Sequence, residues 1–585
     1  PREVLLSHGL WQRRFNGDPD IIGQTLTIDG ASALVVGVMP ATFAFPEPGL
    51  DIWFANRFQA ADRDSWTSHN HNVIARLTAN ADIAQASHEL SALATTLAAE
   101  HPAEMTGWGV NVVSAHADAV RTVQPLLTVL AGVVGVVLLI ACANLATLQL
   151  ARTSRRHVEM AVRAAIGAGR GRLVRQLLTE TLLITGLGGA IGLGVLAASL
   201  KVLLAAAPPN IPFIESVAIN GPVLGFAVAV TLGCGLLVGL VPALLISRGT
   251  VRPLLASTRT TAGGAEIRWR HLLVAAQVGL TLVLLITSGL LVQSVWKLQS
   301  VDHGFDPSHL LTVSIDLPSA RYPDNASQQA FYATLLDQLA GLSGVVSVAG
   351  TSATPATGAN MTFSYAVEGR QAPNPTGRED AQPLQSITPG YFRTMGIPVL
   401  EGRGVDPSDQ ADAPGVIVIN HALAIRHWPT GGAVGARLRF RDNLPWLTIV
   451  GVVADTHDEG LDVPSPPTIY VPFTQRPDTW RWLTWQTLML RTVGDPLAVL
   501  PSVRTTVWEV DRDLPILEAR TMNAAFAQND ARRRFAMSLS GAFAILALGL
   551  AAIGIVGVLS CAMAERRKEI GIRLALGASP TRVAS

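Results

Sequence analysis

The sequence predicts an α-helical integral membrane protein built from duplicated units, with large α+β domains outside the membrane. Of its 585 residues, 49% are apolar and only 15% are charged, and the mean hydropathy is +0.35. This composition is too apolar for an ordinary soluble protein of this size, and the apolar residues are concentrated in long blocks. A short charged motif also occurs twice, each time just after one of these blocks.

The charge and the cysteines argue against several classes of function. The formal net charge is +1, which gives no basis for nucleic acid binding. Cys142, Cys234 and Cys561 all lie within apolar blocks, so we expect small core- or lipid-facing residues and neither a disulfide set nor a metal site. The chain begins at Pro1 and ends at Ser585 within a helical pattern, so we expect a fragment truncated at both ends.

Five stretches are long enough to cross a bilayer, which requires about 20 apolar residues. Soluble core helices rarely run so far without a polar face, so we interpret each stretch as a membrane span. The glycine pairs 188/192 and 235/239 are one helical turn apart and predict close helix packing. We expect no polar lining of the kind that a solute pathway needs. The stretches are about 125–150, 177–204, 223–246, 272–295 and 535–563.

Arginines in the connecting segments predict the orientation of the spans. Residues 151–175 hold seven arginines and one acid, and residues 247–271 hold five arginines and one acid. Residues 206–222 contain no lysine or arginine. Because positively charged loops remain in the cytoplasm, residues 1–123 and 296–534 are predicted to lie outside.

The second external segment alternates strand and helix patterns. Residues 310–316, 326–342 and 345–349 predict a β-α-β unit. A second strand-helix-strand set is predicted at 488–491, 496–510 and about 515–519. Between the two sets, residues 360–474 predict a β-rich insert with many Gly and Pro turn signals.

The N-terminal segment repeats this external pattern. Ser7-His8 resembles Asn420-His421, and Val36-Gly37-Val38 resembles Val450-Gly451-Val452. A predicted strand at Val73–Leu77 and a predicted helix at 82–100 correspond to the strand at 488–491 and the helix at 496–510. We therefore expect the chain to start midway through one external domain and to contain all of a second.

The spans and patterns divide the chain into six segments. They are the C-terminal part of a first external domain (1–123), a first membrane unit of three spans (124–247), a cytoplasmic linker (248–271), the first span of a second unit (272–295), a second external domain (296–534) and the beginning of the second membrane unit (535–585).

The charged motif has the pattern E-[MI]-[AG]-[IV]-R-x-A-[IL]-G-A, at Glu159–Ala168 and at Glu569–Ala578. Each residue of the second copy follows its counterpart by 410 residues, in register with the preceding span. An acid four residues before an arginine, as at Glu159 and Arg163, is the favourable orientation for a helical ion pair worth about 0.3–0.5 kcal/mol. The glycine near the end suits a helix C-terminus. The motif thus predicts a short amphipathic helix on the cytoplasmic face.

This order of external domains, spans and motif resembles the MacB/FtsX superfamily of ABC transporter permeases. The duplicated arrangement is similar to the large orphan permeases of the ADOP family, which are common in acidobacteria. The stretch Val510–Pro515 also resembles this family. The resemblance implies FtsX-type four-span membrane units, MacB-like periplasmic domains and a fusion that replaces a homodimer.

On this resemblance, the motif is interpreted as a coupling helix that docks on an ATPase subunit. The alternative is a helix that anchors the chain to anionic lipid. Two copies in register favour docking. The predicted coupling residues are Glu159, Arg163, Ile166, Gly167, Ala168, Glu569, Arg573, Leu576, Gly577 and Ala578.

The sequence predicts no enzyme. The pattern G-x-x-x-x-G-K-[ST] is absent and none of the three lysines follows a glycine, so a P-loop cannot form. We predict no catalytic, metal-binding or cofactor-binding residue, and ATP is assigned to a partner subunit.

We expect a permease that passes ATPase motion to periplasmic domains for efflux or extrusion, in a multi-pass protein of the bacterial inner membrane. The expected partners are the lipid bilayer and an ABC ATPase, and a periplasmic partner is left open. The runner-up is a non-transporting scaffold that regulates cell-envelope enzymes. A third alternative, an orphan without its ATPase, is disfavoured because both motifs are intact.

Overall fold

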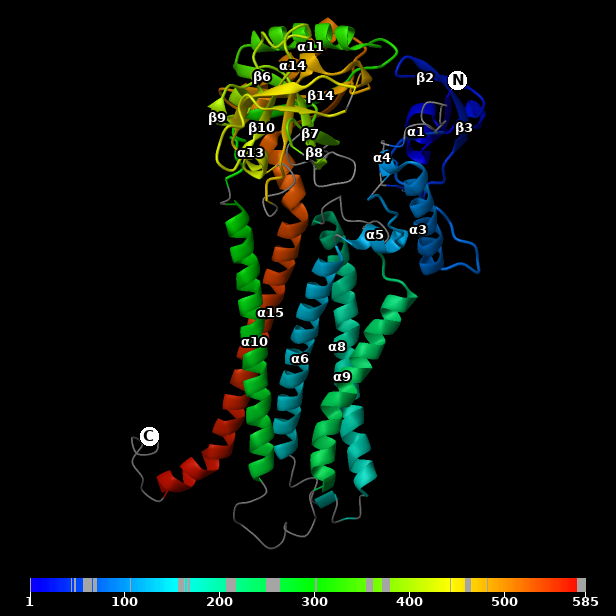
Figure 1. The fold of residues 1–585 in the computed structure, drawn as a ribbon. Helices are drawn as coiled ribbons and strands as arrows, with labels where there is room; N and C mark the ends of the chain where they lie inside the picture. Colours follow the sequence, from blue (N-terminus) through cyan, green and yellow to red (C-terminus); the bar gives the residue numbers. More distant parts are fainter. Residues whose placement is uncertain are drawn as a thin grey trace. The chain divides into compact units, whose positions relative to one another are not determined.

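The chain forms two compact units in the computed structural model (Figure 1). One unit comprises Pro1–Ser114 and Val301–Asn529, and the other comprises Ala115–Ser300 and Asp530–Ser585. The structure describes all residues except 1, 44, 47–48, 56–65, 67–70, 106, 122, 156–161, 164–165, 167–168, 207–216, 249–262, 300–301, 354–360, 371–378, 442, 458–463, 481 and 576–585.

Five long helices carry the predicted spans, which confirms the α-helical membrane fold (Figure 1). Their apolar segments run Leu127–Gln149, Val174–Ala206, Gly221–Leu240, Leu272–Ser294 and Met537–Val556. At most 28% of any of these segments is buried within the protein, as expected for helices that lipid surrounds. The helices are α6 (Gln124–Arg155), α8 (Arg170–Ala206), α9 (Gly221–Arg248), α10 (Gly263–Gln299) and α15 (Met522–Ala575).

Helices α8 and α9 pack through small residues, as one of the two glycine pairs predicts. A Cβ on Gly235 would lie 2.5 Å from Thr185 Oγ1, and a Cβ on Gly239 would lie 2.9 Å from Leu178 Cδ2. Glycine therefore permits the close approach. Gly188 and Gly192 have open space at the Cβ position, so the prediction for that pair is wrong; Gly189 faces α9 instead.

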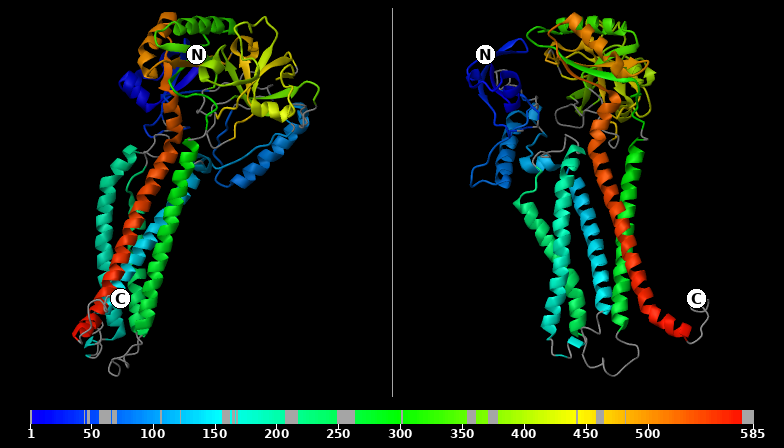
Figure 2. Two further views of the ribbon diagram at one scale, coloured as in Figure 1. Left: turned by 90° about the vertical axis from the view of Figure 1, so that its left-hand side faces the viewer. Right: turned by 180° about the vertical axis from the view of Figure 1, so that it is seen from behind.

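Helices α6, α10 and α15 share an apolar core (Figure 2). Its buried members are Val133, Ile140, Leu284 and Ala547. Because α6 belongs to the first membrane unit of the sequence and α10 and α15 belong to the second, this core joins the two copies.

The second external domain contains a split β-α-β fold. Its strands lie in the order β6-β14-β5-β15, and α11 and α14 connect β5 to β6 and β14 to β15. Leu311, Val313, Leu335 and Val503 are buried where the helices cover the sheet. The elements are β5 (Leu310–Asp316), α11 (Asn325–Ala340), β6 (Val345–Thr351), β14 (Trp485–Thr492), α14 (Leu500–Val510) and β15 (Ile516–Thr521).

The predicted β-rich insert lies between β6 and β14 in the sequence, and its strands form a closed ring. The strand order is β13-β10-β12-β11-β7-β8, and β8 also pairs with β13. Closure removes exposed sheet edges. The elements are β7 (Met361–Val367), β8 (Glu379–Ile387), α12 (Tyr391–Met395), β9 (Val399–Gly402), β10 (Val416–Asn420), α13 (His421–His427), β11 (Arg437–Arg439), β12 (Leu447–Val453) and β13 (Ile469–Pro472).

The N-terminal sheet repeats the topology of this insert. Strands β1 and β3 are parallel, as are β10 and β12, and each pair has a register shift at one position. After the shift, Leu5 pairs with Gly37 and Val418 pairs with Gly451. These glycines are the residues that the sequence comparison had matched. The elements are β1 (Arg2–Leu6), α1 (His8–Phe15), β2 (Thr25–Ile28), β3 (Ala31–Val38) and β4 (Ile52–Phe54).

Of the two elements predicted to continue this repeat, the helix is present and the strand is not. The predicted helix is present as α3 (Ile83–Glu100), but Val73–Leu77 is not a strand, and the side chain of Val73 is 88% exposed. In the second domain the matching strand β14 lies between β5 and β6, which come earlier in the chain than the insert. In the described part of the chain, Val73–Leu77 pairs with no strand.

Several short helices complete the described elements. They are η1 (Pro19–Ile21), α4 (Pro102–Met105), α5 (Ala115–Arg121), η4 (Phe473–Gln475), η5 (Asp478–Trp480) and η6 (Pro496–Val499).

Candidate functional site

Helix α15 joins the external domain to the second copy of the charged motif without a break. It has 54 residues, from Met522 to Ala575. At 1.5 Å per residue, its length is about 80 Å. Glu569 and Arg573 lie inside it, so the motif is helical at these two residues, but it continues the membrane helix and does not form the separate short helix that the sequence predicted. Their role in coupling stays a prediction.

The first turns of α15 are anchored in the core of the external domain. Met522 is fully buried and Ala525 is 2% exposed. The ring of Phe526 contacts the rings of His303 and Phe305, at centroid distances of 4.6 and 5.8 Å. His303 and Phe305 belong to the segment that leads from α10 into β5. The incoming segment and the outgoing helix are therefore packed into one core.

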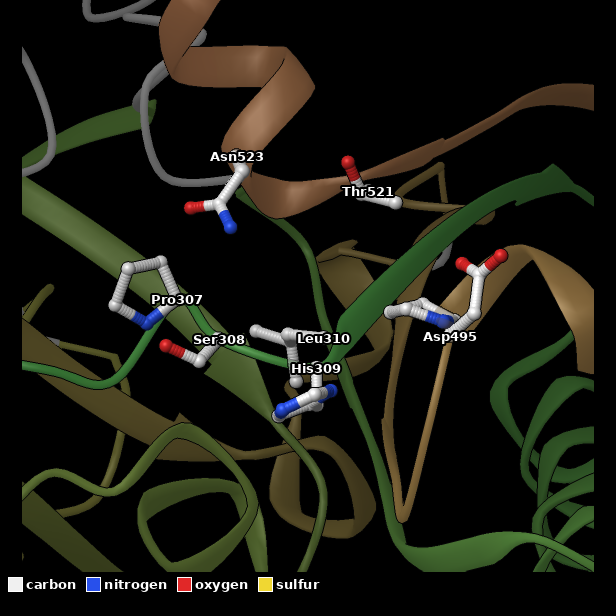
Figure 3. A pocket seen from close by; sticks show the side chains of 8 residues that line it. Pro307, Ser308, His309, Leu310, Asp495, Thr521 and Asn523 are labelled. Atoms are coloured by element: carbon white, nitrogen blue, oxygen red, sulfur yellow. The ribbon is translucent and has the colours of Figure 1, made fainter.

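A surface hollow of about 380 Å³ lies beside this junction (Figure 3). Its carboxylate, Asp495, accepts the N–H of Leu497 at 3.0 Å, and the Nδ1 of His309 lies 3.0 Å from the carbonyl of Gly494. These contacts hold local backbone and form no catalytic set. Across the described part of the chain, no three His, Cys, Asp or Glu side chains are grouped to hold a metal ion. The lining residues are Pro307, Ser308, His309, Leu310, Asp495, Pro496, Thr521 and Asn523.

Part of the first motif is described, and it presents an apolar surface. Val162 and Ile166 are 51% and 81% exposed, and a hydrogen bond of 3.0 Å runs from the N–H of Ile166 to the carbonyl of Val162. Arg163 donates to Gln176 Oε1 of α8 at 2.8 Å. This bond, which the sequence did not predict, ties the motif to the next helix.

The remaining predicted coupling residues stay predictions. The side chains of Glu569 and Arg573 are not described, so the ion pairs between acid and arginine are untested in both copies. Glu159, Gly167, Ala168, Leu576, Gly577 and Ala578 lie outside the described residues.

Two buried amides lie among the predicted spans, and the sequence analysis did not single them out. Asn144 of α6 and Gln277 of α10 are only 5% and 1% exposed, and both donate to the carbonyl of Leu550 in α15. The sequence signal was an amide side chain inside each of two long apolar runs. The two amides bind helix backbone and do not form a continuous polar path.

The stretch 510–515, which resembles the family, closes the external domain. Asp511 accepts hydrogen bonds from Arg321 at 2.5 Å and from the hydroxyl of Tyr322 at 2.9 Å. Burial tends to raise the pKa of Asp511, but these hydrogen bonds and the charge of Arg321 outweigh it and hold the pKa below its ordinary value. The carboxylate thus fixes the turn between α14 and β15.

The buried side chain of Arg476 also stabilises the external domain. Arg476 is 5% exposed and donates to the carbonyls of Phe473 and Leu483 and to Gln328 Oε1, at 3.3, 2.5 and 2.9 Å. Burial lowers the pKa of Arg476 to about 10, so it remains charged at neutral pH. Each nitrogen of its guanidinium has a protein acceptor, so the side chain holds together the segments around it.

The fold defines a membrane protein with duplicated helical units and two external α+β domains of related topology. The family profile described as MacB-like periplasmic core domain matches residues 1–93 and 274–504, which is more than half of the chain. The profile described as FtsX-like permease C-terminal matches residues 131–252 and 541–585. The chain belongs to the MacB-like family, and both of its family regions occur twice.

Curated relatives share part of this organisation. The chain is 26% identical over 191 residues to the pyoverdine export ATP-binding/permease protein PvdT of Pseudomonas syringae, with 31% of this chain and 28% of that protein covered. It is 25% identical over 242 residues to the macrolide export ATP-binding/permease protein MacB of Neisseria gonorrhoeae, with 39% and 34% covered. The chain therefore spans about a third of the length of these two relatives.

A permease without assigned function and two solved structures are also similar. The ABC transporter permease YknZ of Bacillus subtilis is 23% identical over 174 residues, with 30% of this chain and 43% of that protein covered. The periplasmic region of MacB from Actinobacillus actinomycetemcomitans aligns with a TM-score of 0.26 and 13% identity, covering 39% of this chain and 95% of that one. The extracellular domain of YknZ aligns with a TM-score of 0.25 and 14% identity, covering 36% and 100%.

Proposed function

We propose that this chain is the permease of an ABC-type exporter and passes the motion of a partner ATPase to its periplasmic domains. The observation that carries this proposal is the unbroken helix α15. Its first residues belong to the external core at Met522 and Ala525, and it includes Glu569 and Arg573 of the coupling motif. Its backbone hydrogen bonds continue from the external core to the motif, so a displacement at one end is passed along the helix to the other.

The names of the relatives support export as the output. PvdT and MacB are both named as export ATP-binding/permease proteins. This chain matches a third of their length and has no P-loop pattern, so we place ATP hydrolysis in a separate subunit. Because both family regions occur twice, one chain supplies both permease halves, and the fusion takes the place of a homodimer.

The proposed location is the inner membrane of a bacterial cell, with the external domains in the periplasm. The arginine-rich segments then face the cytoplasm, where the ATPase binds. The side chains of Val162 and Ile166 are exposed and lie one helical turn apart. Such an apolar stripe is suited to a hydrophobic groove on that subunit, because the groove would remove it from water. The periplasmic domains would engage either the exported material or a periplasmic partner.

Co-purification of an ABC ATPase from the native cell tests this proposal. The variants Arg163→Glu and Arg573→Glu reverse the motif charge in each copy. Ile166→Glu alters the exposed stripe and leaves the bond between Arg163 and Gln176 in place. Arg172→Glu, an exposed site on α8, is the matched control for charge. We expect the ATPase to be recovered with the parent chain and with the control, and to be lost with the three motif variants.

Recovery of a cell-envelope enzyme without any ATPase would contradict the proposal and would support the scaffold alternative. Equal recovery of the ATPase with all variants would place its docking site outside the motif. ATP hydrolysis by the purified chain alone, measured as phosphate release, would contradict the assignment of hydrolysis to a separate subunit.

A further inference from the structure

Three helices from the two copies meet at one backbone carbonyl inside the membrane unit. Asn144 Nδ2 of α6 donates to the carbonyl of Leu550 in α15 at 2.6 Å, and Gln277 Nε2 of α10 donates to the same oxygen at 3.2 Å. Both amides are buried. A buried amide among apolar spans is costly without a partner, so each holds its helix to this point of α15.

Gly554, one turn beyond Leu550, makes room for the two amides. A Cβ at this position would lie 2.2 Å from Asn144 Oδ1 and 2.5 Å from Gln277 Nε2. Any larger residue would force both amides to move away from the Leu550 carbonyl. Asn144 Oδ1 has no conventional hydrogen-bond partner, and it lies against Gly554, whose Cα–H groups are weak donors at helix interfaces.

The two contacting positions are equivalent in the duplication. Gly554 follows Asn144 by 410 residues, and Leu550 follows Ile140 by the same number, which is the spacing of the charged motifs. The first copy thus carries the amide where the second copy carries the glycine. Two asparagines at this position would compete for one space, and two glycines would remove the donor that Asn144 supplies to the Leu550 carbonyl.

We propose that Asn144, Gln277 and Gly554 form a heterotypic clamp by which α6 of the first copy selects α15 of the second copy of the same chain. The clamp fixes the register of the two helices that lead to the two coupling motifs. This proposal rests on the proposed pairing of two permease halves in one chain. It identifies the residues that make the two halves unequal. A second molecule of this chain cannot offer a matching α6–α6 or α15–α15 contact.

Intrachain cross-linking of the full chain in lipid nanodiscs tests the clamp. In a background without Cys142, Cys234 and Cys561, cysteines replace Val137 and Ala547, which pack in the core shared by α6 and α15. A short bis-methanethiosulfonate reagent then joins the helices, and the rate is followed by the mobility of the linked chain in SDS gels.

Two clamp variants are compared with two matched controls. Asn144→Leu removes the donor at constant size, and its control Thr147→Val removes a buried hydroxyl that bonds its own helix at Ala143 O, at 2.8 Å. Gly554→Ala fills the space of the amides, and its control Gly549→Ala adds a methyl group in open space on the same helix. We expect cross-linking to slow by about fivefold or more in both clamp variants and to be unchanged in both controls.

The exchange variant Asn144→Gly with Gly554→Asn supplies the positive test. It returns an amide and a glycine to opposite helices, so its rate should exceed that of Gly554→Asn alone. Clamp variants that behave like their controls, or an exchange variant no faster than the single one, would overturn the proposal. These results are independent of the ATPase: a parent chain that cross-links as expected but recovers no ATPase would contradict the proposed function and leave the clamp standing.

Discussion

The anchoring of α15 in the external domain yields a quantitative prediction. Met522 is fully buried in a core with Phe305 and Met395, and it is the first residue of the helix. Met522→Ala removes three heavy atoms from this core. If the anchoring couples the domain to the helix, the first turns of α15 should open far more often in the variant.

The size of the effect follows from the burial. Replacing a fully buried Met by Ala costs about 2–5 kcal/mol, because apolar contacts are lost and a cavity remains. A value of about 3 kcal/mol corresponds to a roughly 100-fold increase in the population of the open state. Amide hydrogens of residues 526–529 bond to the first turn, so their exchange with solvent should accelerate by up to this factor.

Hydrogen–deuterium exchange with mass spectrometry measures this acceleration in the full chain. Leu517→Ala is the control, because Leu517 lies on the adjacent strand β15 and is 61% exposed. It should leave the exchange of residues 526–529 unchanged. Equal exchange in the two variants would refute the view that this core anchors α15.

Three further predictions concern the elements that support the site. Asp511→Asn should lower the midpoint of thermal unfolding at pH 7, because Arg321 loses one of its two charged acceptors and keeps only Asp513. The effect should fade as the pH falls below about 4, because the folded-state pKa of Asp511 is depressed and its contribution is lost when the carboxylate is protonated. Gly235→Val should destabilise the membrane unit by about 1–3 kcal/mol, because the side chain would overlap α8. Arg476→Met should destabilise the external domain by about 3–5 kcal/mol, because three acceptors lose their donor.

Each of these predictions has a direct check. Thermal unfolding of the Asp511 variant at pH 7 and pH 3 should show a larger difference from the parent at pH 7, and an equal difference at both values would contradict the pKa argument. Gly233, with open space at its Cβ position, provides the control for Gly235. If the Arg476 variant unfolds at the parent temperature, its hydrogen bonds do not stabilise the domain.

The sequence predicted the helices and the repeat because both depend on local patterns. Long apolar runs predicted five spans to within seven residues of their ends, and Gly37 and Gly451 were matched before their equivalent registers were known. The strand expected at Val73–Leu77 failed because a strand needs partners that its own sequence does not reveal. The ladder of β14 depends on β5 and β6, which are far away in the sequence.

Of the candidate site, only the part that depends on helical periodicity could be predicted from the sequence. The motif's pattern predicted an amphipathic helix, and Val162 and Ile166, one helical turn apart, are its exposed apolar residues. The bond from Arg163 to Gln176 joins two helices and could not be predicted from this pattern. Asn144 and Gln277 are polar residues inside long apolar runs, and their common target is a backbone carbonyl. No side-chain pattern reports a contact to backbone.

The central claim is that α15 transmits ATP-driven motion to the external domain. Spin labels at the exposed residues Val36 and Val493, in the cysteine-free chain bound to its ATPase, report the distance between the two external sheets with and without ATP and vanadate. Gly541→Pro breaks α15 where the Cβ position is open, and Gly541→Ala is the control. We predict an ATP-dependent change of distance in the control and none in the proline variant, although the ATPase remains bound. An unaltered change in the proline variant would contradict the account.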